Sequence, residues 1–285
     1  MHLGFIVPRD LRDVSYPEVC AWAKEQGFSF VDTHRVLPDG GPVAARSGLH
    51  PGVPTLTAAT VNEIFSPDKR ARDGAVHTLV EYLEQASRQG ITIVLGLLNN
   101  VDPSLSLAQN FDRFAATWQP VVAAADCFGI RIALEPWPGH GRNLCYAPEM
   151  FRRVFAAFDS PALGLCFDPS HFVWMGNDHM RVLREFAPRI YHVHAKDTEI
   201  LKDGLYDYGI LNRQFTEGQR GSGWWRYRLP GYGVLQWRQI LSALCENGYD
   251  GAVCIEHEDP IYEGSEERAK RGLILAQRYL EPFIA

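Results

Sequence analysis

The stretch Arg189-Ile-Tyr-His-Val-His-Ala-Lys-Asp197 carries the most informative pattern of the chain. Its residues alternate as they do in a β-strand, which places His192, His194 and Lys196 on one face of that strand. Imidazoles are buried in proteins when they bind a metal ion or pair with a carboxylate. Carboxylates also end three other strand-like runs of the chain, at Glu135, Asp168 and Glu256. The pattern therefore predicts that these side chains meet at one site.

The length and composition are those of a globular protein with one large core. The chain has 285 residues, of which 46% are hydrophobic and 22% are charged. A barrel of alternating strands and helices takes roughly 250 residues, so the length suits a single barrel of this kind. The formal net charge of -6 offers no basic surface for a nucleic-acid backbone, and we expect no nucleic-acid partner.

Cysteine usage and hydropathy predict a cytoplasmic protein. The six cysteines are scattered and none forms a C-x-x-C pair, so we expect reduced and mostly buried thiols. The first residues run directly into an apolar segment without a basic region. No apolar run approaches the roughly 18 residues of a membrane span, and we therefore expect no membrane association.

Short apolar runs alternate with helix-like segments along the whole chain. The expected strands are residues 3–7, 28–32, 53–58, 91–97, 131–135, 163–168, 189–197 and 251–258. The expected helices are residues 16–26, 68–89, 105–128, 148–158, 178–186, 236–247 and 262–279. Such alternation implies parallel strands. Eight of them in this length predict an α/β fold, a (β/α)8 TIM barrel formed as a single domain by residues 1–285.

Two segments interrupt the alternation of expected strands and helices. Residues 37–54 are rich in Gly and Pro and are expected to form a loop. Residues 198–235, after the seventh expected strand, are expected to form a long loop, and loops of that length are uncommon unless they serve a function. Within the expected helix 105–128, Pro120 is predicted to kink or divide the helix.

The polar strand ends predict a metal site. Active sites of TIM barrels lie at the C-terminal ends of the strands, and strands five to eight end in Glu135, Asp168, His194 and Glu256. Each residue alone could be an ordinary solvated acid or a paired histidine. Together, three converging carboxylates would repel one another unless a cation neutralised them. Three oxygen ligands and one imidazole suit one Mn²⁺ or Mg²⁺ ion, with Co²⁺, Fe²⁺ or Zn²⁺ able to substitute.

The motifs that contain this quartet resemble one protein family. Glu135, Asp168-Pro-Ser-His171, His194-Ala-Lys-Asp197 and Glu256 together resemble the sugar phosphate isomerase/epimerase superfamily, the xylose isomerase-like TIM barrels that include ketose 3-epimerases and inosose-processing enzymes. The resemblance covers the second half of the chain by motif and the first half by element order. It implies that the quartet binds one divalent ion, most often Mn²⁺.

The resemblance also implies roles in catalysis. It assigns Glu135 and Glu256 as the acid/base pair on either side of a sugar carbon, and His171 as a substrate contact beside the metal. A proton next to a carbonyl becomes removable when a metal polarises the carbonyl oxygen and stabilises the enediolate. Return of the proton to the other face of the carbon gives epimerisation, and transfer to the neighbouring oxygen gives isomerisation.

Further residues are candidates for substrate binding. Lys196 and Asp197 follow His194 in the pattern of the superfamily, although Lys196 could instead neutralise the carboxylates. Trp137 follows the fifth strand. Arg226 and Arg228 alternate with aromatic residues in the expected long loop, where guanidinium groups suit anionic or hydroxyl oxygens. His192 is interpreted as a hydrogen-bonded core histidine.

The aromatic run makes the sequence similar to one branch of the superfamily. Trp224 and Trp225 offer faces on which a sugar ring can stack, which resembles 3-keto-glycoside epimerases and the catalytic subunits of C-glycoside deglycosidases. The alternative is that these tryptophans bury a loop or an oligomer interface. Expected partners are therefore a small sugar substrate and either a second copy of the chain or an accessory subunit.

Three other functions compete with an isomerase or epimerase. A lyase of the deglycosidase or dehydratase type would use the same enolisation on an oxidised sugar. An abasic-site endonuclease shares the quartet but uses three zinc ions and further histidines, and the expected strands 53–58 and 91–97 contain none. An inactive barrel that serves as a binding subunit would bind no metal.

Overall fold

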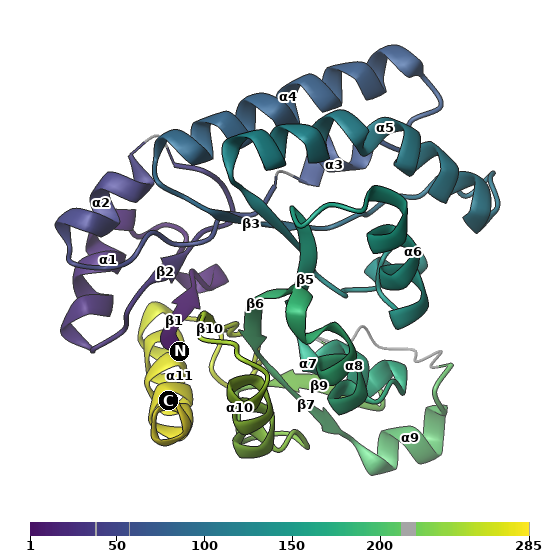
Figure 1. Cartoon of the computed structure of the whole chain (residues 1–285). Helices are drawn as coiled ribbons and strands as arrows, with labels where there is room; N and C mark the ends of the chain where they lie inside the picture. Colours follow the sequence, from purple (N-terminus) through teal and green to yellow (C-terminus); the bar gives the residue numbers. More distant parts are fainter. Residues whose placement is uncertain (38, 57, 212–220, 285) are drawn as a thin grey trace.

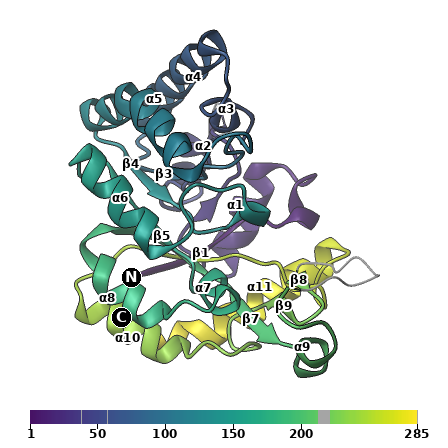
Figure 2. The same ribbon diagram turned by 90° about the vertical axis from the view of Figure 1, so that its right-hand side faces the viewer.

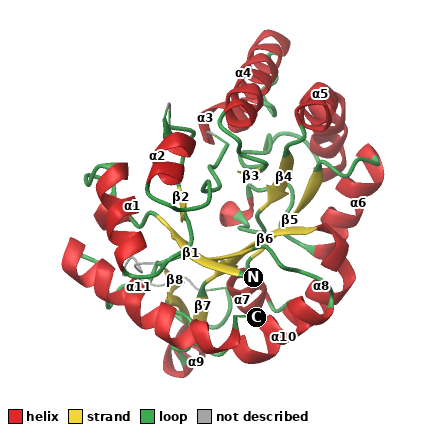
Figure 3. Cartoon of the chain, turned by 60° about the vertical axis from the view of Figure 1, so that its left-hand side comes forward, coloured by secondary structure: helices red, strands yellow, loops and turns green. Residues whose placement is uncertain are grey.

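The computed structural model describes residues 1–37, 39–56, 58–211 and 221–284. Across these residues, parallel strands form a curled seven-stranded sheet in the order β2-β1-β10-β6-β5-β4-β3. The strands are β1 (His2–Ile6), β2 (Val31–Asp32), β3 (Ile93–Gly96), β4 (Arg131–Leu134), β5 (Leu163–Phe167), β6 (Ile190–Ala195) and β10 (Ala252–Ile255). Helices surround this sheet on the outside (Figures 1 and 3), which confirms the predicted α/β fold of the TIM-barrel type.

The two edges of the sheet are joined by residues 53–56. Isolated bridges pair Thr33 with Pro54 and Thr55 with Leu95, so the segment lies between β2 and β3. The expected strand over residues 53–58 is therefore wrong as a regular strand. Pro54 has no N–H to donate, and helix α3 (Ala58–Glu63) already begins at the end of the expected strand.

The expected helices are present, with small changes of length. The helices are α1 (Tyr16–Glu25), α2 (Gly40–Arg46), α3, α4 (Lys69–Arg88), α5 (Leu107–Phe128), α6 (Pro148–Phe158), α7 (Pro169–Met175), α8 (His179–Phe186), α9 (Lys202–Tyr208), α10 (Trp237–Glu246) and α11 (Glu266–Leu280). Short 3-10 turns lie at Arg9–Leu11, Gly139–Gly141, Ala187–Arg189 and Glu281–Phe283. Among the described helices, none combines the length and the apolar character that crossing a membrane requires.

Two expectations about local structure need correction. Helix α5 is one helix that continues through Pro120, so the proline does not divide it, and a kink at Pro120 stays a prediction. Helix α2 lies inside the segment 37–54, which was expected to be a loop. Its first residues are Gly40, Gly41 and Pro42, and a proline is tolerated there because the N–H groups of a first helical turn have no partner within the helix.

The expected long loop over residues 198–235 is also largely folded, apart from residues 212–220, which lie outside the described part. Its strands β7 (Asp197–Ile200), β9 (Trp225–Arg228) and β8 (Gly221–Ser222) form an antiparallel sheet in that order, and helix α9 follows β7. We call these three strands the inserted sheet. Figure 2 shows them grouped beside α7 at one end of the molecule.

A β-bulge adjusts the strand that carries the histidines. Leu165 of β5 pairs with Ile190, but Cys166 pairs with His192, so Tyr191 is an extra residue on β6. Tyr191 packs in a cluster with Leu95, Ala133 and Cys166. Every residue of β6 is buried, which is typical of a central parallel strand.

Candidate metal centre

Four neighbouring strands bring the predicted quartet together. Glu135 directly follows β4, Asp168 follows β5, His194 lies near the end of β6, and Glu256 follows β10. One ligand atom from each side chain lies within 4.8 Å of those from the other three. Because β10, β6, β5 and β4 are adjacent and parallel, their C-terminal ends meet at the same edge of the sheet.

The contacts of His194 would suit a metal ligand. Its Nδ1 atom lies 2.9 Å from Oε2 of Glu256 and 3.5 Å from Oε1 of Glu135. Nevertheless, neither ring nitrogen makes a hydrogen bond, although both atoms are buried. Two ligand atoms that each lie about 2.1 Å from one ion, and that form a right angle at that ion, are about 3 Å apart. They need no hydrogen bond between them at that distance. The geometry therefore suits an ion shared by the imidazole and the carboxylates.

Asp168 also presents one oxygen that has no hydrogen bond. Its Oδ1 atom accepts from the backbone N–H of Ser170 at 2.9 Å and from the Ser170 hydroxyl at 2.6 Å. Its Oδ2 atom lies 3.1 Å from Nζ of Lys196 and 3.1 Å from Nε2 of His171, but makes no hydrogen bond with either. A fully buried carboxylate oxygen in this state has the lone pairs that a cation would bind.

Lys196 is buried among the carboxylates. Its ammonium donates to Oε2 of Glu256 at 2.7 Å and to Oε2 of Glu258 at 3.3 Å. Burial alone would lower the pKa of Lys196, but the charges of Asp168 and Glu256 raise it well above its usual range. The single ammonium cannot neutralise the carboxylates that surround it, which are those of Glu135, Asp168, Glu256 and Glu258. A divalent ion would supply the missing positive charge.

The carboxylates of the quartet are held in their ionised form. Burial would raise the pKa of Glu135, but the hydrogen bond with His171 and the nearby imidazole of His194 lower it well below its usual range. Likewise, burial would raise the pKa of Glu256, and the charge of Lys196 lowers it. Ionised carboxylates are the form that binds a metal ion.

His171 lies beside the quartet because of the local geometry of helix α7. Asp168 is the N-cap of this helix, Pro169 is its first residue, and His171 follows three residues after the cap. This spacing turns the imidazole back toward Asp168 and Glu135, where Nε2 lies 3.4 Å from Oε1 of Glu135. On its other side, Nδ1 of His171 makes a hydrogen bond of 2.8 Å with the hydroxyl of Tyr227.

A cavity opens beside three residues of the quartet, Glu135, His194 and Glu256. It has a volume of about 170 Å³, and Trp137 lines it as expected, together with Glu135, His194, Lys196 and Glu256. Glu258, which sequence analysis did not select, also lines it. Its spacing of two residues from Glu256 within the expected strand 251–258 was the available signal.

A second cavity adjoins the first. It has a volume of about 940 Å³ and shares Trp137 and Glu258 with the smaller cavity. Its aromatic lining includes Trp174, Trp225 and Tyr227.

Three predicted substrate contacts lie elsewhere, at the inserted sheet. The carboxylate of Asp197 accepts hydrogen bonds from the backbone N–H groups of Thr198, Gly231 and Leu235. Arg226 donates to Glu199, and Arg228 donates to Glu199 and to Asp259. The structure does not bring these three side chains to the quartet, and their contacts anchor the inserted sheet.

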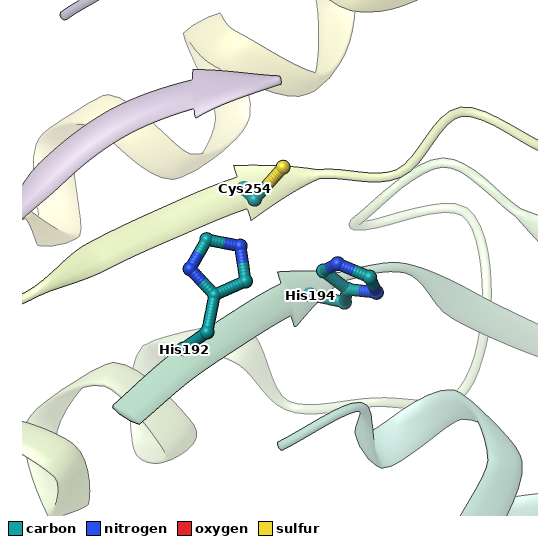
Figure 4. Close-up of side chains that lie close together, drawn as sticks. All are labelled: His192, His194 and Cys254. Carbon is teal, nitrogen blue, oxygen red and sulfur yellow. The ribbon is translucent and has the colours of Figure 1, made fainter. Parts of the chain in front are cut away.

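A second group of potential ligands lies deeper in the barrel. Figure 4 shows His192 and His194 on β6 and Cys254 on the neighbouring β10, all of them buried. Nε2 of His192 lies 2.8 Å from Oδ2 of Asp32, which comes from β2. These two atoms lie within ion-pair distance but make no hydrogen bond, so the hydrogen bond predicted for a core histidine is absent at His192. His194 belongs to both groups.

Comparisons with known proteins agree with this architecture. The family model described as "Xylose isomerase-like TIM barrel" matches residues 20–279. The uncharacterized protein YfiH of Bacillus subtilis is 34% identical over 146 residues, which are 50% of this chain and 45% of YfiH. An inosose dehydratase of Clostridium perfringens is 31% identical over 143 residues, with the same coverage. The matched part thus spans less than half the length of these curated relatives.

Solved structures share the fold over the full chain. D-psicose 3-epimerase from Clostridium cellulolyticum H10, crystallised with D-tagatose, has a TM-score of 0.77 at 15% identity and covers 100% of this chain and 99% of its own. The 3-keto-D-glucoside 4-epimerase YcjR from E. coli has a TM-score of 0.74 at 14% identity, covering 99% of both chains. The IOLI protein, which was crystallised with a zinc atom, has a TM-score of 0.71 at 19% identity and covers 99% and 96%.

Proposed function

The chain belongs to the xylose isomerase-like TIM barrel family, and we propose that it is a divalent-metal-dependent sugar isomerase or epimerase. The substrate would be a keto sugar or a 3-keto-glycoside, and the reaction would move a proton at a carbon next to the carbonyl. One observation carries this proposal: Glu135 and Glu256 reach the same small cavity as His194 and Lys196. Two carboxylates beside a candidate cation site are what proton removal and return require.

Glu135, Asp168, His194 and Glu256 would hold the metal ion. Their unpaired buried atoms and their charge fit a divalent cation, and we propose one ion per chain, with Mn²⁺ as the first candidate. When bound, the ion would polarise the substrate carbonyl and stabilise the negative charge that develops on its oxygen. The zinc in the IOLI structure supports a divalent site of this kind.

Side chains of the protein would carry out the proton transfer and hold the substrate. A carboxylate oxygen of Glu135 or Glu256 takes the proton, and the other glutamate returns a proton to the carbon. Lys196 donates a hydrogen bond to Glu256 and His171 makes one to Glu135, so each carboxylate is held at a fixed position. Trp137 lines the same cavity and offers an apolar face to a sugar ring.

A second candidate function is a lyase on the same scaffold. The 31% identity to an inosose dehydratase favours this alternative, because removal of water can follow the same proton abstraction. The aromatic cavity next to the site would leave room for a leaving group larger than water. By contrast, an endonuclease with three zinc ions would need three sets of ligands. The described residues offer two groups of potential ligands, and these share His194.

Proton exchange with solvent tests the proposed chemistry directly. We expect the metal-loaded protein to replace a carbon-bound hydrogen of a keto sugar or 3-keto-glycoside by deuterium in D₂O, measured by proton NMR. Glu256→Gln should abolish this exchange and keep the circular dichroism spectrum of the native chain. Glu63→Gln, an exposed change outside the lining of the site cavity, is the matched control.

The products of the same reactions separate the two candidates. An epimer or isomer would support the first function, and an unsaturated sugar or a released aglycone would support the lyase. If Glu256→Gln exchanged the proton as fast as the native chain, the proposed acid/base role of Glu256 would be wrong.

A further inference from the structure

Three side chains form a hydrogen-bonded chain that leads from the inserted sheet to the candidate metal centre. The indole N–H of Trp174 donates to the hydroxyl oxygen of Tyr227 at 3.3 Å. The same hydroxyl lies 2.8 Å from Nδ1 of His171. At the far side of the ring, Nε2 of His171 lies 3.4 Å from Oε1 of Glu135.

For a neutral imidazole, one direction of this chain pairs the Tyr227 proton with an acceptor inside the chain. An indole nitrogen only donates, so the Tyr227 oxygen accepts from Trp174. The single proton of the Tyr227 hydroxyl is then available for Nδ1 of His171. A neutral imidazole that accepts at Nδ1 carries its own proton on Nε2. The proton of His171 therefore faces the carboxylates of Glu135 and Asp168.

Burial and packing hold His171, Tyr227 and Trp174 in this hydrogen-bonded arrangement. His171 is fully buried and Tyr227 is 5% exposed, so water has little access to the hydrogen bond between them. Trp174 is held in place because its ring stacks on Trp225, with centroids 4.4 Å apart and an interplanar angle of 6°. The ring of Tyr227 is also fixed, because the Lys196 ammonium lies 4.5 Å from its centroid.

The opposite tautomer would fit the site poorly. With the proton on Nδ1, the lone pair of Nε2 would face Oε1 of Glu135 and Oδ2 of Asp168, which lies 3.1 Å away. Three acceptors would then converge without a proton between them, which is unfavourable in a buried site.

We propose that Tyr227 is a positioning residue that fixes the tautomer and orientation of His171, so that its Nε2–H points to the proposed acid/base residue Glu135. Tyr227 belongs to β9 and lies 56 positions after His171, so the inserted sheet contributes to the site through this contact. The effect on catalysis rests on the proposed function, whereas the tautomer does not.

Nitrogen NMR measures the tautomer without any substrate. The full-length protein would be labelled with ¹⁵N-histidine and loaded with diamagnetic Mg²⁺ or Zn²⁺, and His171→Gln would assign the His171 signals. Protonated and unprotonated ring nitrogens resonate in separate ranges. We expect an unprotonated Nδ1 and a protonated Nε2 in the native chain. Tyr227→Phe, which keeps the ring over Lys196, should produce a mixture of tautomers or the Nδ1–H form.

Two further variants make the test specific. Trp174→Phe removes the indole donor and keeps an aromatic ring, and we expect a partial loss of the Nε2–H form. Tyr206→Phe changes a hydroxyl on a side chain that is 90% exposed, and we expect the native pattern. A native His171 that is protonated on Nδ1, or a pattern unchanged by Tyr227→Phe, would overturn the proposal.

Kinetics then separate this proposal from the proposed function. If the chain exchanges sugar protons, we expect Tyr227→Phe to lower kcat by about 10-fold or more with a smaller change in KM, because positioning of a catalytic partner is lost. An unchanged kcat would remove the catalytic consequence. Failure of the native chain to exchange any sugar proton would contradict the proposed function and leave the NMR result to decide the tautomer.

Discussion

The ammonium of Lys196 lies 2.7 Å from Oε2 of Glu256, 60 positions later in the chain. Both side chains lie beside the smaller cavity, and Lys196 is only 1% exposed. A buried ammonium in contact with a carboxylate stabilises the ionised form of that carboxylate. Lys196 is thus a fixed positive charge next to the proposed metal site. A variant without its ammonium should distinguish the effect of this charge from the effect of the metal ion.

We expect Lys196→Met to retain the metal and lose activity. Removing the ammonium leaves the quartet more negative, so metal affinity should stay equal or rise. Glu256 would lose the donor that holds it, and sugar proton exchange should fall by about 100-fold, at the low end of what a positioned acid or base contributes. Metal content by elemental analysis and exchange rate by NMR test this. Lys69→Met removes an exposed lysine that pairs with Asp73 and should change neither.

Removal of the imidazole ligand should have the opposite effect. We expect His194→Ala to lower metal affinity by more than about 100-fold, because losing a residue that only hydrogen-bonds a ligand already costs about 10- to 100-fold. Isothermal titration calorimetry with Mn²⁺ measures the affinity. His77→Ala is the matched control, since His77 is an exposed histidine of α4. Native affinity in His194→Ala would exclude His194 from the ligand set.

The buried pair of His192 and Asp32 should contribute to stability and not to metal binding. Removing the imidazole leaves the buried Oδ2 atom of Asp32 without its neighbour, so His192→Ala should lower the free energy of unfolding by about 1 to 3 kcal/mol. Denaturant unfolding measures this change. Metal content per chain should remain the same. A loss of one ion per chain would instead show that His192, His194 and Cys254 hold an ion of their own.

Asp197 should make the stability of the chain depend on pH. Burial raises the pKa of Asp197 to about 6, although backbone N–H donors oppose the shift. The folded state then binds a proton that the unfolded state releases near pH 4. The stability contribution of Asp197 is therefore largest below about pH 4 and falls as the pH rises to about 6, by roughly 2 to 3 kcal/mol.

A comparison with Asp197→Asn isolates this effect. The difference in unfolding free energy between the native chain and the variant should be larger at pH 4.5 than at pH 7. An equal difference at both pH values would show that Asp197 is ionised throughout. The amide should also destabilise the chain at both pH values, since its NH₂ group cannot accept the backbone N–H groups of Thr198, Gly231 and Leu235.

Local sequence patterns were sufficient to predict most of the fold. The end of α5 followed from Gly129, the C-cap residue, which adopts a φ of 67°. The alternation of apolar runs and helices gave the parallel sheet and the edge at which Glu135, Asp168, His194 and Glu256 converge. These features depend on neighbouring residues, and the sequence displays them directly.

Long-range contacts decided the rest. Residues 53–56 pair with β2 and β3 only through isolated bridges, and the extra residue Tyr191 on β6 follows from its pairing with β5. The inserted sheet pairs β7 with β9, and Asp197 of β7 accepts hydrogen bonds from backbone N–H groups up to 38 positions away. No periodicity in the sequence predicts such pairings, because they depend on contacts between groups that are far apart in the sequence.

The residue types of the candidate metal centre were therefore determined by the sequence alone, and their environment by the tertiary structure. Four candidate ligands at four strand ends could be identified from strand order, since parallel strands align their ends. That Tyr227 meets His171, and that Asp32 meets His192 across the barrel, required the folded chain. A buried polar atom must find a partner in space, and the nearest partner is seldom the nearest in sequence.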